Sequence, residues 1–130
     1  MRRFVSILED RRRGHVGNLA EALTPSEARR RPETSANMKA VVKDLVSMHK
    51  QLQPLLTRQQ LHAIFHQVLT AFDAGLVEAY RAVDTAPLFS RQCIVQDVHY
   101  LRQEVAKLHL SLPQGCCPEL VQFAQALPVQ

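Results

Sequence analysis

The sequence has little of what most small catalytic or disulfide-bonded folds depend on. It contains no tryptophan, only four glycines and only three cysteines in 130 residues. Phosphate-binding and dinucleotide-binding loops need clustered glycines, and neither these motifs nor a nucleophile elbow occurs. An odd number of cysteines, two of them adjacent, is a poor disulfide framework and favours a reducing, cytosolic setting. We therefore expect a protein that is not an enzyme and uses no cofactor.

Other absences limit the fold. No apolar run approaches the ~20 residues that cross a bilayer, and no secretory signal is visible at the N-terminus. Aromatic residues make up 5% of the chain, and β-branched residues do not alternate with polar ones. No strand is predicted from this pattern. A hydrophobic content of 46% and a charged content of 22% are typical of a single globular domain of this length.

Helical periodicity is clear in three stretches. In the first, from about 38 to 53, apolar residues recur every three or four positions until Pro54 ends the pattern. The second opens with a capping box made by Thr57 and Gln60. It contains Gly75, which is costly within a helix and therefore indicates a close neighbour. The third, from between 85 and 90 to Leu108, has apolar steps of four and three that suit packing against another helix.

The whole chain is predicted to be one all-α domain, a bundle of four to five mostly antiparallel helices. It divides into an N-terminal helix at 1–23, a basic linker at 24–37 and a helical bundle at 38–127, which ends in a short helix from Pro118. Glycines at 14 and 17 indicate a kink in the first helix. The predicted core consists of Val42, Leu45, Met48, Phe65, Val68, Phe72, Ile94, Val98 and Leu101.

Several side chains could carry chemistry, but each has a simpler interpretation. His62 and His66 share one helix face, as zinc ligands do, yet no third ligand or general base accompanies them. Cys116 and Cys117 could bind a metal or form a strained vicinal disulfide, and loop cysteines are the alternative. Cys93 lies beside the cation of Arg91 but has no base or oxyanion hole.

Two acidic residues on the third helix are also candidates for acid–base chemistry. Asp97 and Glu104 lie seven positions apart and so share roughly one face. Paired catalytic carboxylates usually come from different elements around a cleft. We therefore expect both to be solvated, with Glu104 near Lys107.

The net charge of +4 belongs entirely to the first 31 residues, which hold eight basic and four acidic residues. Two arginine triplets account for most of it. They are candidates for contact with an anionic membrane surface or with nucleic acid phosphates, and a solvated linker and exposed helix face are the third interpretation. Nucleic acid is unlikely because no aromatic residue lies among them. The candidate contact residues are Arg11, Arg12, Arg13, Arg29, Arg30 and Arg31.

The stretch from Met38 to Leu108 resembles the C-terminal helical domain of the vacuolar protein sorting fifty-four family, a subunit of the Golgi-associated retrograde protein (GARP) complex. The helices expected at Phe4–Leu8 and Pro118–Leu127 fall where that domain has helices. The residues that carry the resemblance are Val41-Val42-Lys43, Met48-His49, Leu55-Leu56, Phe65, Val95-Gln96-Asp97-Val98, Tyr100, Leu101 and Leu108.

The resemblance implies a rod-like helical bundle of the type found in multisubunit tethering complexes (CATCHR type), exocyst among them. It implies a non-catalytic interaction module in retrograde transport from endosomes to the trans-Golgi network, located at the cytosolic face of these membranes. The implied partners are other tethering-complex subunits, endosomal or Golgi membrane proteins and an anionic membrane surface. The family subunit is many times longer, so this chain corresponds to a fragment or a truncated relative. A basic nucleic-acid-binding helical domain and a domain of another tethering complex such as exocyst are the alternatives.

Overall fold

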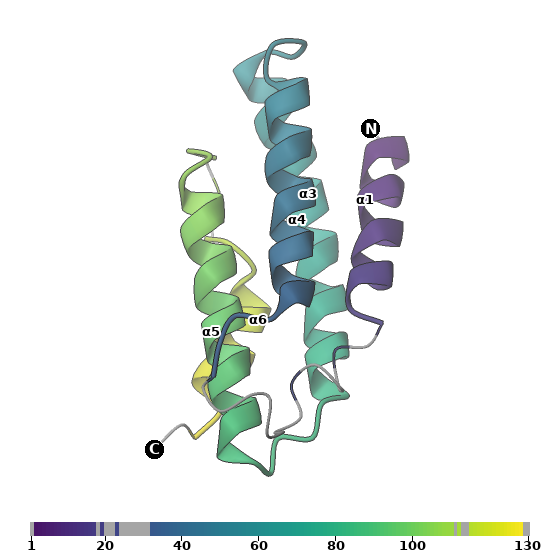
Figure 1. The fold of residues 1–130 in the computed structure, drawn as a ribbon. Helices are drawn as coiled ribbons and strands as arrows, with labels where there is room; N and C mark the ends of the chain where they lie inside the picture. The colour runs from purple at the N-terminus through teal and green to yellow at the C-terminus, as the bar shows by residue number, and fades with distance from the viewer. Residues whose placement is uncertain are drawn as a thin grey trace.

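The structure is a computed structural model that describes residues 2–17, 19, 23, 32–110, 112 and 115–128. Five helices occur in these ranges, and none of the residues described there belongs to a β-strand. The prediction of an all-α bundle is therefore confirmed. The helices, labelled as in Figure 1, are α1 (Arg2–His15), α3 (Ala36–Leu52), α4 (Arg58–Arg81), α5 (Leu88–Ala106) and α6 (Pro118–Gln125).

The helices enclose a single apolar interior. α3, α4 and α5 run alternately up and down in Figure 1, with α1 beside α4 and the short α6 beside α5. The closest backbone packing forms a cycle, because α1 contacts α3, α3 contacts α5, α5 contacts α6, α6 contacts α4 and α4 contacts α1. The largest side chains buried inside this cycle are Phe65, Phe72 and Tyr80, all from α4. Eight of the nine predicted core residues are buried, and Met48 is half-buried.

Local signals set most helix ends. Ser35 caps α3 by accepting a hydrogen bond from the backbone N–H of Met38 at 3.1 Å. The predicted capping box of α4 is present, with Thr57 and Gln60 each accepting from the backbone N–H of the other. These bonds satisfy N–H groups that have no partner within the helix. Pro87 precedes the first residue of α5, where its missing N–H costs nothing.

Some predicted boundaries differ from the structure. α1 ends at His15, and Val16 and Gly17 form a turn, so the helix predicted over 1–23 is interrupted where the glycines indicated a kink. Of the residues that follow, up to position 23, only Leu19, which is helical, and Leu23 are described. α3 begins at Ala36, and the last two positions of the predicted linker are therefore helical. Leu108 lies in the turn that follows α5. Residues 24–31 of the predicted linker, including Arg29–Arg31, lie outside the described residues.

Gly75 has the close neighbour that its position predicted. The guanidinium group of Arg12 lies over Gly75 on α4, and a Cβ at position 75 would overlap it. Arg12 is 6% exposed and is held by two hydrogen bonds to Glu9, from Nε to Oε1 at 2.8 Å and from Nη2 to Oε2 at 2.9 Å. The absence of a side chain at position 75 thus lets a paired arginine pack between α1 and α4.

This packing predicts coupling between positions 12 and 75. Alanine is favoured over glycine in a helix by about 1 kcal/mol, so Gly75→Ala should stabilise the protein by that amount only where Arg12 has been shortened, as in Arg12→Ala. With Arg12 intact, Gly75→Ala should give no gain, because the guanidinium must leave its site. Urea unfolding of the wild type, Gly75→Ala, Arg12→Ala and the double variant measures the effect of Gly75→Ala on stability with and without the Arg12 side chain. An equal gain in both backgrounds would contradict the close approach.

His49 places a titratable ring inside the bundle. The ring packs edge-on against Phe65, with ring centroids 5.4 Å apart, and so joins α3 to α4. Burial, and secondarily the charge of His62, lowers the pKa of His49 below its ordinary value of 6.5. The neutral ring therefore contributes stability that is complete above pH 6.5 and is lost as the pH falls through the lowered pKa.

We expect the free energy of unfolding to fall less steeply with decreasing pH in His49→Gln than in the wild type, below pH 6.5. Urea unfolding at a series of pH values measures this slope. His66→Gln, at an exposed position of α4, is the matched control and should leave the slope as it is. Equal slopes for the wild type and His49→Gln would show that His49 does not contribute.

Candidate functional site

Asp97 is the most deeply buried charged residue that the structure describes, so the prediction that it is solvated is wrong. It is 0% exposed on α5. Its carboxylate accepts hydrogen bonds from the N–H of Ser35 at 2.6 Å, the Oγ of Ser35 at 2.7 Å and the Oη of Tyr80 at 2.6 Å. Asp97 therefore joins the beginning of α3, the last turn of α4 and the middle of α5.

Burial dominates the electrostatics of this group. Burial raises the pKa of Asp97 despite the opposing hydrogen bonds from Tyr80 and Ser35. Burial, reinforced by the charge of Asp97, raises the pKa of Tyr80 well above its usual 10.0. The hydroxyl groups of Ser35 and Tyr80 and the N–H of Ser35 thus all serve to connect helices through the Asp97 carboxylate. Glu104, in contrast, is partly exposed and pairs with Lys107 at 3.2 Å, as predicted.

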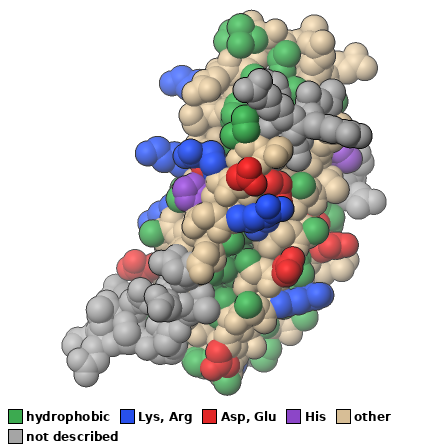
Figure 2. All heavy atoms as spheres, turned by 90° about the vertical axis from the view of Figure 1, so that its right-hand side faces the viewer, with side chains coloured by type: hydrophobic (Ala, Val, Ile, Leu, Met, Phe, Trp, Pro, Cys, Tyr) green, Lys and Arg blue, Asp and Glu red, His purple; other side chains and the backbone are tan. Residues whose placement is uncertain are grey.

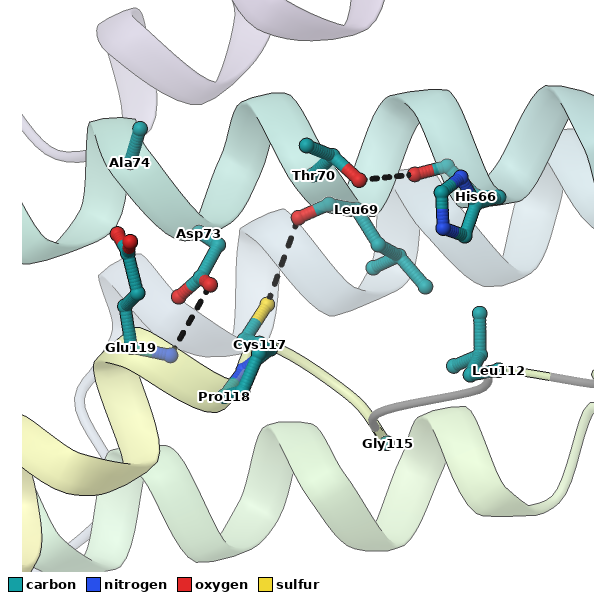
Figure 3. Close-up of a pocket in the computed structure, with 10 residues that line it drawn as sticks. All are labelled: His66, Leu69, Thr70, Asp73, Ala74, Leu112, Gly115, Cys117, Pro118 and Glu119. Carbon is teal, nitrogen blue, oxygen red and sulfur yellow. Dashed lines mark hydrogen bonds between the residues drawn. The ribbon is translucent and has the colours of Figure 1, made fainter.

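A second buried carboxylate has a similar role. Asp73 of α4 accepts hydrogen bonds from the backbone N–H groups of Glu119 and Leu120 at 3.1 and 2.8 Å. The residue before α6, Cys117, makes no side-chain cap, so Asp73 supplies the cap from another helix. Figure 3 shows Asp73 directed at the beginning of α6, in a pocket of about 480 Å³ that His66 also lines.

The histidine and cysteine candidates do not converge on a metal site. Among the residues that the structure describes, no group of three metal-ligating side chains occurs. His66 is exposed and His62 is partly exposed on α4. Cys93 is buried, while the neighbouring Arg91 donates to the carbonyls of Thr85 and Ala86, both at 2.7 Å.

The first arginine triplet is engaged within the protein. Arg11 donates two hydrogen bonds to the carboxylate of Asp44, at 2.8 and 2.9 Å, and joins α1 to α3. Arg12 is buried against Gly75, and Arg13 pairs with Asp10 at 3.5 Å with both side chains exposed. Of the six arginines predicted to contact an anionic surface, Arg11 and Arg13 are thus exposed, Arg12 is covered, and Arg29–Arg31 are not described.

Asp44 has partners on two sides. His15 lies 2.7 Å from Asp44 and shares its carboxylate with Arg11. Although partial burial alone would raise the pKa of Asp44, the hydrogen bonds from Arg11 and His15 lower it overall. The one acidic residue of α3 is therefore compensated by α1.

Three lysines on α3, which were not among the predicted contact residues, form an exposed cationic surface. Lys39, Lys43 and Lys50 are exposed and are spaced so that they share one helix face over about 16 Å. No ion pair joins any of them to a carboxylate among the described residues. We name these three lysines the α3 basic surface. Figure 2 shows Lys and Arg side chains gathered along one edge of the face that carries α1.

The α3 basic surface lies on the outside of a helix, without a catalytic group. Val46 is the exposed apolar residue within the lysine row. Such a surface can attract an extended anionic surface through several charges at once. In the described ranges, no helix combines the length and hydropathy needed to cross a membrane. Comparison of the chain with known protein families, curated proteins and solved structures finds no match.

The three hydrogen bonds to Asp97 predict that Asp97→Asn is destabilising. An asparagine replaces one accepting oxygen with a donor, so one buried donor loses its partner, at a cost of about 1–3 kcal/mol. Glu104→Gln on the same helix should change stability by less than about 0.5 kcal/mol. Chemical unfolding of both variants provides the measurement, and similar small effects would mean that the Asp97 hydrogen bonds are dispensable.

Proposed function

We propose that this chain is a non-catalytic interaction module of a vesicle-tethering complex of the GARP type, acting in retrograde transport from endosomes to the trans-Golgi network. The proposal combines the resemblance of the stretch from Met38 to Leu108 with the all-helical bundle. In this interpretation the bundle rigidly supports a docking surface. It acts at the cytosolic face of endosomal or Golgi membranes.

The observation that carries the docking part of the proposal is the row of exposed lysines on α3, none of which makes an ion pair with a carboxylate in the described part of the chain. We assign the α3 basic surface to contact with an anionic membrane. A basic residue near anionic headgroups contributes about 1 kcal/mol. Three lysines on one face can engage a flat layer of headgroups together, whereas a compact ligand would need a concave site.

The arginines of α1 support this surface in a different way. Arg11 neutralises Asp44, which would otherwise place a negative charge on the same helix as the lysines, and His15 shares the same carboxylate through a hydrogen bond. Of the arginine triplet on α1, Arg11 therefore supports the lysine row by compensating Asp44. Arg12 has no part in the contact, because it is buried against Gly75.

Charge reversal of the α3 basic surface tests the docking. The triple variant Lys39→Glu, Lys43→Glu and Lys50→Glu should bind phosphatidylserine-containing vesicles roughly 100-fold more weakly than the wild type, from ~1 kcal/mol per lysine. Flotation of the full chain with these vesicles and with phosphatidylcholine vesicles measures it. Wild-type binding should also fall as salt is raised.

A matched control reverses three exposed basic residues of α4 and α5, namely Arg58, Arg81 and Arg102. The Arg58→Glu, Arg81→Glu and Arg102→Glu variant changes the net charge by the same amount. It should still bind the vesicles if binding depends on the position of the lysines on α3 and not on the net charge of the protein. Equal losses in both triple variants, or no binding by the wild type, would refute the assignment. Retention on duplex DNA but not on vesicles at the same salt would favour the nucleic-acid alternative.

Membership of a tethering complex needs a separate experiment. The tagged full chain, purified from cells of its own source, should bring down several subunits of one tethering complex in fixed proportion. Their identity would distinguish a GARP-type complex from an exocyst-type one. Vesicle binding without any tethering subunit would leave the membrane contact standing and refute the tethering role.

A further inference from the structure

Two adjacent thiols lie where α6 begins, outside the α3 basic surface. Cys117 is buried and adopts φ 50°, a left-handed conformation. Its carbonyl accepts the N–H of Val121, the first backbone hydrogen bond of α6. Its sulfur lies 3.7 Å from the carbonyl oxygen of Leu69 on α4 (Figure 3). The backbone at Cys117 is therefore fixed by both α4 and α6.

Cys116 has a different environment from its neighbour. It is partly exposed and lines a pocket of about 470 Å³, on the side of α5. His99 and Arg102 of α5 line the same pocket and are both exposed. Cys116 thus borders a pocket that a cationic side chain also lines, whereas Cys117 is buried with its sulfur against the Leu69 carbonyl of α4.

The pKa values of the two thiols are also shifted in opposite directions. A hydrogen bond from Cys117 lowers the pKa of Cys116, although burial and the charge of Asp73 oppose it, and Arg102 adds a smaller contribution in the lowering direction. The same hydrogen bond, together with burial, raises the pKa of Cys117 well above its usual value. Because the thiolate is the reactive form of cysteine, Cys116 is the nucleophile of the pair and Cys117 is its proton-bearing partner.

We propose that Cys116 is a reversible oxidation site for hydroperoxides and that Cys117 resolves the oxidised form. The Cys116 thiolate attacks one peroxide oxygen and the O–O bond breaks, giving a sulfenic acid on Cys116 and hydroxide. The Cys117 sulfur then attacks the Cys116 sulfur. The S–O bond breaks, the Cys117 proton goes to the leaving oxygen, and water departs. Two thiols and one hydroperoxide thus give one disulfide, one water and the hydroxide or alkoxide, which takes up a proton.

The disulfide between neighbours should be easy to reduce. Adjacent Cα atoms are about 3.8 Å apart, less than the roughly 4.4–6.8 Å that disulfides usually span. The resulting strain makes the bond a stronger oxidant than an ordinary structural disulfide. Reduced glutathione should therefore restore both thiols, which suits a modification that is made and reversed in a reducing compartment.

Hydrogen peroxide treatment of the full chain, followed by peptide mapping and intact mass measurement, tests the proposal. The wild type should lose two hydrogens and contain a Cys116–Cys117 disulfide, and reduced glutathione should reverse both changes. Cys117→Ser should stop at a sulfenic acid on Cys116 that dimedone traps. Cys116→Ser should leave Cys117 and Cys93 as thiols over the same time. Cys93→Ser, which removes a thiol buried in α5, should behave as the wild type.

The role of Arg102 can be measured separately. Alkylation of Cys116 by iodoacetamide should be about tenfold faster than that of Cys93 in the folded protein, and Arg102→Gln should slow it. Arg81→Gln, on α4, is the matched control and should not. The proposal is overturned if Cys93 reacts as fast as Cys116, if the disulfide joins two chains, or if peroxide leaves Cys116 a thiol.

Discussion

The bundle depends on one buried carboxylate. Asp97, on α5, accepts hydrogen bonds from Ser35, the residue that caps α3, and from Tyr80 in the last turn of α4. Ser35 also caps α3, so the carboxylate orders the residue that begins that helix. An apolar residue in place of Asp97 would leave these donors unpaired in the interior. The register of α3 against α5 thus follows from polar geometry as well as from apolar packing.

Much of the fold could be predicted from local sequence. The capping box of Thr57 and Gln60 is a backbone motif, and its residues suffice to place the beginning of α4. The seven-residue spacing groups Asp97 with the exposed Glu104, yet Asp97 also lies three residues after Ile94 and four before Leu101. Those apolar neighbours share its helix face, and this was the available signal for burial. The donors that satisfy Asp97 come from distant positions, and no local pattern identifies them.

The basic residues divide in a way that counting charges could not reveal. Arginine has a planar guanidinium that suits paired hydrogen bonds. Arg11 and Arg12 each make such a pair with a carboxylate of the same chain, Arg11 at the surface and Arg12 in the interior. Lysine, a strongly hydrated point charge, remains exposed at Lys39, Lys43 and Lys50. The lysines do share a helix face in sequence, so their row could have been recognised by spacing. Arg12 and Arg13 pair with Glu9 and Asp10 three residues earlier on α1, so their partners could also have been recognised by spacing. Only the pairing of Arg11 with Asp44 depends on a tertiary contact, between α1 and α3.

The cap that Asp73 provides has a consequence for the C-terminal part of the chain. A helix of eight residues is too short to persist alone in water, and α6 borrows the cap of its first turn from α4. Separation from α4 would remove the cap and the apolar contacts of Leu120 at once, so docking and helicity of α6 are a single event. The protein therefore has a segment that can open as a unit while the Asp97 hydrogen bonds persist, and such local opening exposes backbone amides without global unfolding.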